Sequence, residues 1–180
     1  MNLYTADLHF GHRASITFDH RPFADIDEMD RVLIELWNSR VSFGDNVYIV
    51  GDFAYKNEKP FVWYLRQLKG HKHLIIGNHD NKLLNDSSAL GYFDSVSDRL
   101  RLSDGDKKLE LSHYPMAEWN GFYDDVYHIY AHIHNKTENT FRYMRQFDRA
   151  LNAGCMINNY TPASINELIR NNQIFKEAHL

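Results

Sequence analysis

The sequence predicts an α/β protein whose first half builds a layer of parallel strands. Short apolar runs alternate there with amphipathic segments in the order strand, helix, strand, helix, strand, and this alternation is typical of parallel sheets. A second observation is that five apolar runs along the chain end in Asp, His or Asn side chains. Because sites in open α/β sheets form outside the carboxyl ends of strands, these endings predict one site. The second half is richer in β-like runs, so we expect it to be more antiparallel.

The first elements follow from the spacing of apolar residues. Residues 2–6 predict a short buried strand, and the irregular stretch 8–24, with breakers at Gly11 and Pro22, predicts a loop. The segment 27–40 predicts an amphipathic helix, because its apolar residues recur at helical spacing behind acidic capping residues. The apolar stripe of this helix is expected to cover a sheet.

A second strand and a third strand are expected at 46–50 and 72–76. The helix between them begins near Pro60, which suits a first helical turn, and ends at Gly70. The second half opens with a predicted hairpin whose turn contains Gly105. The flanking and later β-like runs are 93–102, 107–111, 126–131, 139–144 and 147–152. A last helix is expected to begin near Thr161-Pro162 and to stop at Asn171-Asn172.

Bulk properties are those of one soluble domain spanning residues 1–180. No apolar run approaches the ~20 residues that span a bilayer, and the first residues lack a secretory signal pattern, so we expect no membrane association and a cytoplasmic location. Cys155 is the single cysteine, which suits a reducing compartment and predicts a buried, inert thiol. The formal net charge of −4 argues against a broad surface for duplex nucleic acid. Oligomeric state is left open.

The polar side chains at the strand ends form a set of candidate metal ligands: Asp7, His9, Asp52, Asn78, His113, His132 and His134. Imidazole mixed with carboxylate and amide groups suits Mn, Fe, Zn or Co better than Ca. Seven protein ligands are too many for one transition-metal ion, whereas two ions ~3.5–4 Å apart would use them all. Asp52 stands alone at its strand end and is therefore expected to bridge the two ions.

The ordered motifs resemble the calcineurin-like metallophosphoesterase superfamily. They are Asp7-x-His9, Gly51-Asp52, Gly77-Asn78-His79-Asp80, His113 and His132-x-His134. Each motif is weak alone, but five in this order, each after a β-like run, are specific and span nearly the whole chain. The resemblance implies a four-layer α/β/β/α sandwich, with two mixed sheets flanked by helices, as a single metallophosphoesterase domain without a cap domain. Two departures are Ala131, where the family usually has glycine, and the lack of a further acidic residue after Asp52.

The resemblance also implies roles for individual residues. The first ion would be held by Asp7, His9, Asp52 and His134, and the second by Asp52, Asn78, His113 and His132. His79 would be the catalytic imidazole, with Asp80 as its orienting partner. Two divalent ions are expected, Mn²⁺ first, with Fe, Zn, Co or Ni as alternatives. The implied reaction is hydrolysis of a phosphate ester by a hydroxide that bridges the ions.

The absence of an obvious cap domain favours an open site, which we expect to accept phosphodiesters that are small or of nucleotide type. A phosphomonoesterase or a nucleotide pyrophosphohydrolase is the alternative among enzymes. The alternative of another class is a non-catalytic scaffold with the same fold. Such scaffolds tend to have lost site residues, whereas His79 and every expected ligand are present here, which favours the enzyme.

Substrate contacts are less specific in the sequence. His12 either lines the substrate pocket or caps the loop that contains it, and Arg13 and Arg21 either hold a phosphate or stay solvated. Tyr114 and Trp119 either stack on a base or sugar or only pack inside the protein.

Overall fold

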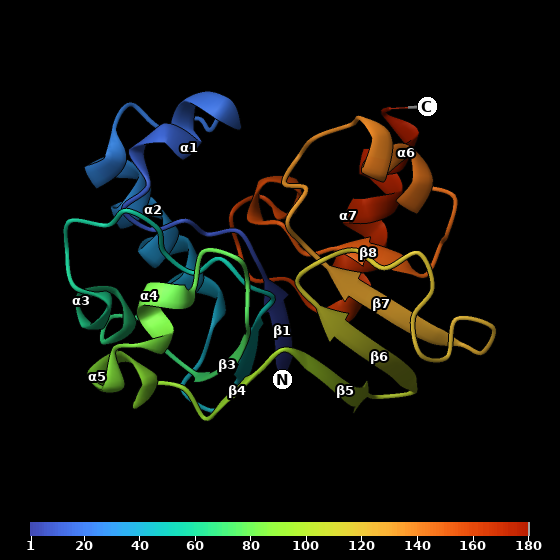
Figure 1. Ribbon diagram of the computed structural model, residues 1–180, viewed down its shortest axis with the longest axis horizontal. Helices are drawn as coiled ribbons and strands as arrows, with labels where there is room; N and C mark the ends of the chain where they lie inside the picture. The colour runs from blue at the N-terminus through green and yellow to red at the C-terminus, as the bar shows by residue number, and fades with distance from the viewer. Residues whose placement is uncertain (180) are drawn as a thin grey trace.

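Two four-stranded sheets pack against each other in the computed structural model, which describes residues 1–179 (Figure 1). Side chains from both sheets form one buried apolar cluster between them. Its members from the strands and their ends are Tyr4, Ala6, Val50, Ile75, Leu109, Leu111, Ile129, Ala131, Leu151 and Ala153. Burial of these groups on both sheets holds the layers together. The predicted sandwich of two sheets flanked by helices is confirmed.

The first sheet is entirely parallel. Its strands, in spatial order, are β1 (Asn2–Thr5), β2 (Asn46–Ile49), β3 (His71–Ile75) and β4 (Ser95–Ser97). The register pairs Tyr4 with Tyr48 and Tyr48 with His73. The loops that follow the strands therefore leave from the same edge of the sheet. The parallel layer predicted from the first half is confirmed, but this sheet is not mixed as the resemblance implied.

Helix α2 (Ile26–Arg40) packs on the outer face of the first sheet (Figure 1). Its first turn is capped by Asp25, whose Oδ1 accepts the N–H of Glu28 at 2.9 Å. Its buried face includes Leu33 and Trp37, so the predicted amphipathic helix is confirmed. Three shorter helices lie on the same side of the molecule: α3 (Phe61–Leu65), α4 (Asn81–Leu84) and α5 (Ser87–Leu90). The helix expected between Pro60 and Gly70 is thus shorter than predicted.

The second sheet is mixed. Its strands, in spatial order, are β5 (Arg99–Asp104), β6 (Lys107–Ser112), β7 (Val126–Tyr130) and β8 (Ala150–Asn152). The hairpin between β5 and β6 is antiparallel, and Gly105 turns it with a φ of 62°, a conformation that suits glycine. The pairs β6–β7 and β7–β8 are parallel. The expectation of a more antiparallel second half therefore holds only for the predicted hairpin.

Two short helices replace segments for which the sequence predicted no helix. Helix α1 (Arg13–Phe18) lies within the expected loop 8–24, and helix α6 (Asn139–Met144) occupies a run that was expected to be β-like. In α6 the buried residues are Phe141 and Met144, three positions apart. That spacing places both on one helical face, which explains why the β-like interpretation of this run was wrong.

The chain ends with a 3-10 turn, η1 (Cys155–Asn158), and helix α7 (Ile165–Glu177), which packs beside β1 and β8. A capping box between Ser164 and Glu167 starts the helix. The predicted stop at Asn171-Asn172 is wrong, because α7 continues to Glu177. Asn172 is buried; its Oδ1 accepts the backbone N–H of Asn152 at 2.7 Å and its Nδ2 donates to the backbone oxygen of Asn152 at 3.0 Å. These asparagines serve tertiary hydrogen bonds.

Within residues 1–179, no helix is both long and apolar enough to span a bilayer. The thiol of Cys155 is fully buried, and this burial raises its pKa to about 12. A thiol with that pKa stays protonated near neutral pH and is a poor nucleophile. The predicted buried, inert cysteine is confirmed.

Candidate metal centre

The loops after β1 and β2 bring the first candidate ligands together. The N–H of Asp7 donates to the carbonyl oxygen of Gly51 at 3.1 Å, and the N–H of His9 donates to that of Asp52 at 3.1 Å. The loops therefore stay paired beyond the last residues of the two strands. This pairing places Asp7, His9 and Asp52 beside one another, as the position of their motifs at neighbouring strand ends predicted.

Most of the candidate ligands have an unusual backbone conformation. Five non-glycine ligands have φ between 52° and 72°: Asp7, His9, Asp52, His132 and His134. Such left-handed conformations cost about 1–3 kcal/mol each outside glycine, and they persist where the surrounding structure holds them. Their concentration at strand ends turns the chain so that successive side chains enter one space. The strain therefore marks this region as the functional one.

Two glycines allow the loops to approach. A Cβ built on Gly77 would collide with the Oδ1 and the backbone nitrogen of Asp52, and a Cβ on Gly51 would collide with the ring of His113. Gly51 also has a φ of 87°. Any larger residue at either position would push apart the segments that carry Asp52 and His113, so both glycines are required by the geometry.

Four side chains form what we call the first ligand group: Asp7, His9, Asp52 and His134. One donor atom from each lies within 4.8 Å of the others. The Nε2 atom of His9 lies 3.3 Å from Nε2 of His134 and 3.5 Å from Oδ2 of Asp52. Asp7, His9 and Asp52 are buried and His134 is nearly so. The group thus offers two carboxylates and two imidazoles to one point.

A second ligand group, Asp52, Asn78, His113 and His132, adjoins the first. The Oδ1 atom of Asn78 lies 2.9 Å from Nε2 of His113 and 2.9 Å from Nδ1 of His132. Nε2 of His113 also lies 3.6 Å from Oδ2 of Asp52, the oxygen that faces His9 in the first group. Asp52 is therefore shared by the two groups, which is the position that a bridging ligand needs.

The donor set fits divalent metal ions. Burial, reinforced by neighbouring cationic side chains, lowers the pKa values of His9 and His132, so both imidazoles are neutral at pH 7, the form that binds a metal. Burial raises the pKa of Asp7 to about 6 despite the neighbouring His134 and His113. Carboxylates gathered in a buried space favour a compensating cation, and the residues present therefore suit a divalent ion.

Behind the first ligand group lies the buried ion pair of Asp19 and Arg21, which the sequence did not reveal. Both carboxylate oxygens of Asp19 lie within 2.9 Å of Nδ1 of His134, which leaves Nε2 of that ring to face the site. Burial raises the pKa of Asp19, but the hydrogen bond to His134 and the charge of Arg21 lower it on balance. Such carboxylate–histidine pairs fix the tautomer and orientation of a metal ligand. The only signal in the sequence was an acidic residue within an expected loop.

Arg21 is buried, so it is not the solvated residue of one sequence alternative, and its guanidinium is not free for the phosphate of the other. Its guanidinium is fully buried and donates to the Asp19 carboxylate and to the carbonyl oxygens of Asp7 and Leu8 at 2.9 and 2.8 Å. These bonds occupy the face of the guanidinium that a phosphate would use. Arg21 instead holds the loop after β1 in place behind Asp7.

Asp80 does not orient the imidazole of His79, which corrects a second prediction. Its Oδ2 accepts the N–H groups of Gly77 and Asp52 at 2.8 and 2.9 Å, and its Oδ1 accepts that of Phe53 at 3.0 Å. Both oxygens are thus used by backbone donors from two strand-end loops. Asp80 fixes the loops that carry Asp52 and His79, so its effect on the imidazole is indirect.

His79 lies beside the two ligand groups. Its backbone N–H donates to Oδ1 of Asp52 at 2.9 Å. Its ring packs on Tyr55 with centroids 3.9 Å apart and faces the ring of His9 at 5.4 Å. Among residues 1–179 no hydrogen bond occupies its ring nitrogens, which leaves the imidazole available to a substrate. Tyr55, which the sequence analysis did not identify, is the residue that positions this ring.

Of the remaining candidates for substrate binding, some line a pocket or are exposed near the centre and one is buried. His12 is buried, lies with Nδ1 3.2 Å from Nδ1 of His9 and makes no side-chain cap for α1, so it lines a pocket next to the centre, as does the exposed Arg13. Trp119 is buried and donates its indole N–H to Val126, so it only packs. Tyr114 is 52% exposed, with its ring 4.5 Å from that of His132.

Comparison with known proteins gives relatives along most of the chain, although no family model matches. The gene 66 protein of Mycobacterium phage D29 is 30% identical over 159 residues, covering 74% of this chain and 78% of that protein. The uncharacterized protein MJ1445 of Methanocaldococcus jannaschii is 27% identical over 168 residues, covering 92% of this chain and 87% of that protein.

Among solved structures, AQ665 from Aquifex aeolicus, described as a protein of unknown function, has a TM-score of 0.72 at 26% identity and covers 94% of this chain and 98% of that chain. Two enzymes align more loosely. Nuclease MPE of Pseudomonas putida has a TM-score of 0.48 at 19% identity, covering 74% of this chain and 60% of that chain. The phosphoesterase Yfce from E. coli has a TM-score of 0.42 at 13% identity, covering 85% and 77%.

The family follows from the relatives and from the motifs together. The phage D29 protein matches this chain over more than two thirds of both lengths, and the five motifs that suggested the superfamily meet at one end of two facing sheets. The chain therefore belongs to the same family as the gene 66 protein of phage D29, and its motifs resemble those of the calcineurin-like metallophosphoesterase superfamily.

Proposed function

We propose that the protein is a metal-dependent phosphoesterase that hydrolyses phosphodiesters, either small or of nucleotide type, with two divalent ions in the two ligand groups. The observation that carries the proposal is the sharing of Asp52. Its Oδ2 faces His9 at 3.5 Å and His113 at 3.6 Å, so one carboxylate serves both groups. Manganese is the first choice of metal, because the donors are mixed oxygen and nitrogen atoms without thiolate.

When bound, the two ions would lower the pKa of a water and neutralise charge on the phosphate. The chain supplies the rest. Asp7 and Asp52 set the charge of the site, and their loops are held rigid by Asp80 and Arg21. His79 lies next to Asp52 with free ring nitrogens, which suits donation of a proton to the leaving oxygen. No serine or cysteine nucleophile is required.

Exposure of the second ligand group supports a diester substrate. His132 is exposed and Tyr114 beside it is 52% exposed, so this side of the centre is open to solvent. An open centre can accept a phosphate that carries an organic group on each side, whereas a closed one favours a terminal phosphate. We also propose that residues 1–180 form a single domain without a cap over the centre.

The proposal is tested by comparing bis-p-nitrophenyl phosphate with p-nitrophenyl phosphate at several concentrations of Mn²⁺. We expect the diester to be hydrolysed with the higher kcat/KM, and we expect removal of metal by a chelator to abolish turnover. Preference for the monoester would replace the diester assignment by a phosphomonoesterase. Metal binding without turnover of either ester would contradict the enzyme assignment.

A further inference from the structure

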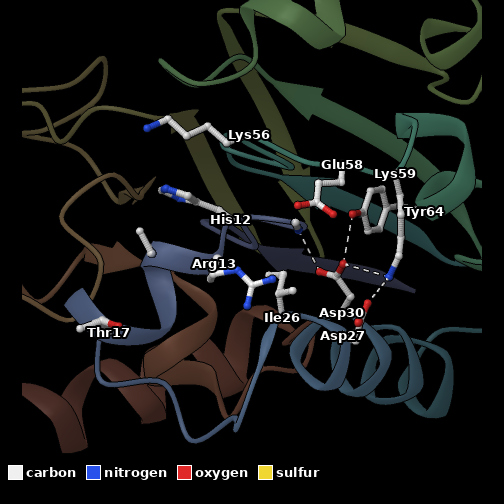
Figure 2. A pocket seen from close by; sticks show the side chains of 12 residues that line it. His12, Arg13, Thr17, Ile26, Asp27, Asp30, Lys56, Glu58, Lys59 and Tyr64 are labelled. Atoms are coloured by element: carbon white, nitrogen blue, oxygen red, sulfur yellow. Dashed lines mark hydrogen bonds and ion pairs between the residues drawn. The ribbon is translucent and has the colours of Figure 1, made fainter.

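A pocket of about 430 Å³ lies between α1, α2 and the segment after β2 (Figure 2). We call it the α1–α2 pocket. It borders the centre at His12, which lines the pocket and whose Nδ1 lies 3.2 Å from Nδ1 of His9; the ring of His12 lies 4.9 Å from that of Tyr55. The pocket is therefore one side chain away from the first ligand group, a distance that an organic group attached to a phosphate at the centre can span.

The floor of the pocket is built and held without a ligand. Asp30 is buried; its Oδ1 accepts the N–H of Gly11 at 2.9 Å and its Oδ2 accepts the hydroxyl of Tyr64 at 3.1 Å. The Nζ atom of Lys59 lies 3.9 Å from Asp30 and 2.6 Å from Asp27. Figure 2 shows this network across the base of the pocket. A preformed pocket costs little to organise when a ligand enters.

The walls combine apolar surface with free charges. Ile26, Ala14 and the ring of Tyr64 line the pocket, and they suit a flat or aliphatic group. Arg13 and Glu58 also line it, both exposed, and neither forms an ion pair with any other residue of 1–179. A free guanidinium attracts the negative charge of a phosphate, and a free carboxylate accepts bonds from N–H or O–H groups.

We propose that the α1–α2 pocket binds the nucleoside of a nucleotide diester, with Glu58 accepting a hydrogen bond from an N–H or O–H group of the base or sugar. The inference rests on the proposed function and narrows its substrate. A nucleoside has the flat ring, the donor groups and the neighbouring phosphate that these walls match, and the volume is in the range of small-molecule sites.

A second hollow, which adjoins the centre at His132 and His134, provides the comparison. It also measures about 430 Å³ and is lined by Phe18, Lys136 and Thr140. Its lysine is already engaged, because Nζ of Lys136 donates to the carbonyl oxygen of Phe18 at 2.6 Å. No side chain of the described residues forms in this hollow a buried polar floor like that of Asp30 and Tyr64. The structure therefore favours the α1–α2 pocket for recognition.

The test compares two esters that both release p-nitrophenol: the p-nitrophenyl ester of thymidine 5′-monophosphate and methyl p-nitrophenyl phosphate. In Ala14→Phe an exposed residue of α1 is enlarged to fill the pocket. We expect the ratio of kcat/KM for the thymidine ester to that for the methyl ester to fall about tenfold or more. Glu58→Gln keeps the shape and removes the charge, and we expect a smaller fall in the same ratio, carried by KM.

The matched control is Thr140→Phe, which fills the second hollow with the same ring from an exposed position of α6. The ratio in this variant should stay near that of the natural protein. A fall in Thr140→Phe but not in Ala14→Phe would overturn the assignment of the pocket, as would equal losses on both esters in Ala14→Phe. Failure of the natural protein to hydrolyse either ester would instead overturn the proposed function, and the inference with it.

Discussion

The two ligand groups share Asp52 but differ in how the protein supports them. The first group is buried, has a second carboxylate in Asp7 and is backed by the Asp19–Arg21 ion pair. The second group replaces that carboxylate with the amide of Asn78 and opens to solvent at His132. Charge and outer hydrogen bonds raise metal affinity, so the first group should bind its ion more tightly. The exposed group is then the side at which a substrate enters.

The largest expected effect is that of Asp52→Asn, which breaks both groups at once. Removing the shared charge leaves the facing imidazoles of His9 and His113 without their common carboxylate. We expect metal content to fall at both groups and hydrolysis to be nearly abolished. The fall in bound metal is measured after gel filtration, and the loss of hydrolysis is measured as kcat on bis-p-nitrophenyl phosphate. The control is Asp124→Asn, which removes an exposed carboxylate. Retention of both ions would contradict the shared role.

His79→Ala should separate chemistry from metal binding. The imidazole is not a member of either ligand group, so we expect the variant to keep its ions. Turnover of a diester with a poor leaving group should fall ~10²–10⁴-fold, the usual range for an acid–base residue. Kinetics on alkyl and p-nitrophenyl esters give the measurement, because a good leaving group needs less protonation. Full activity on the alkyl ester would remove His79 from its assigned role.

Asp19→Asn should weaken the first group alone. The amide is close in shape but no longer supplies the charge that holds Nδ1–H of His134. Burial lowers the pKa of His134, but the hydrogen bond to Asp19 outweighs this and raises it, so the variant should lower that pKa. We expect affinity for the tighter ion to fall ~10–100-fold, with the weaker ion less affected. Equal loss of affinity at both sites in a metal titration would contradict the claim that Asp19 supports only the first ligand group.

The smallest expected effect is a loss of folding stability in acid, caused by the buried His128. Burial lowers the pKa of His128 to about 4, and Nε2 of its ring accepts the N–H of Met116 at 3.1 Å. In the unfolded chain the same imidazole has a pKa of about 6.5. Between pH 6.5 and pH 4 the unfolded chain therefore binds a proton that the folded protein does not, so the free energy of unfolding is highest above pH 6.5 and falls as the pH falls toward 4. At ~1.4 kcal/mol per pH unit the loss is about 2 kcal/mol at pH 5.

Urea unfolding of metal-free protein at pH 7 and pH 5 measures this loss, with His128→Gln for comparison. The variant should have a lower free energy of unfolding at pH 7 and lose less of it on acidification. Burial raises the pKa values of Asp7 and Asp80 to about 6, which gives the opposite slope in both proteins. The difference between the proteins therefore isolates His128, and identical slopes would contradict its role.

The sequence predicted three of the four strands of the first sheet and the set of candidate ligands, because these depend on local patterns, whereas the division of the ligands into two groups came from the family resemblance. The fourth strand, β4, lies in the run 93–102, which was expected to belong to the hairpin of the second half. Apolar runs, helical spacing and the residues at the strand ends are all visible within a few positions. The side chains of Asp7 and His9 share a strand end with Asp52 only if the strands are parallel and adjacent, and the helix α2 between β1 and β2 made that arrangement predictable.

The support behind the groups was not predictable in the same way. Asp19 and His134 are 115 positions apart, and no local pattern pairs them. Arg21 was expected either to hold a phosphate or to stay solvated, and Asp80 was assigned to His79 by the family resemblance, yet both bind backbone groups of strand-end loops. Their roles depend on which donors the fold leaves unpaired, and that is decided by tertiary structure.

If two ions act together on the phosphate, hydrolysis needs both ligand groups filled. The most direct measurement adds Mn²⁺ stepwise to metal-stripped protein while bound metal and hydrolysis of bis-p-nitrophenyl phosphate are followed together. We expect little activity while the first equivalent binds and a rise in kcat in proportion to the second. Full activity with one ion bound per chain would contradict the shared two-ion centre.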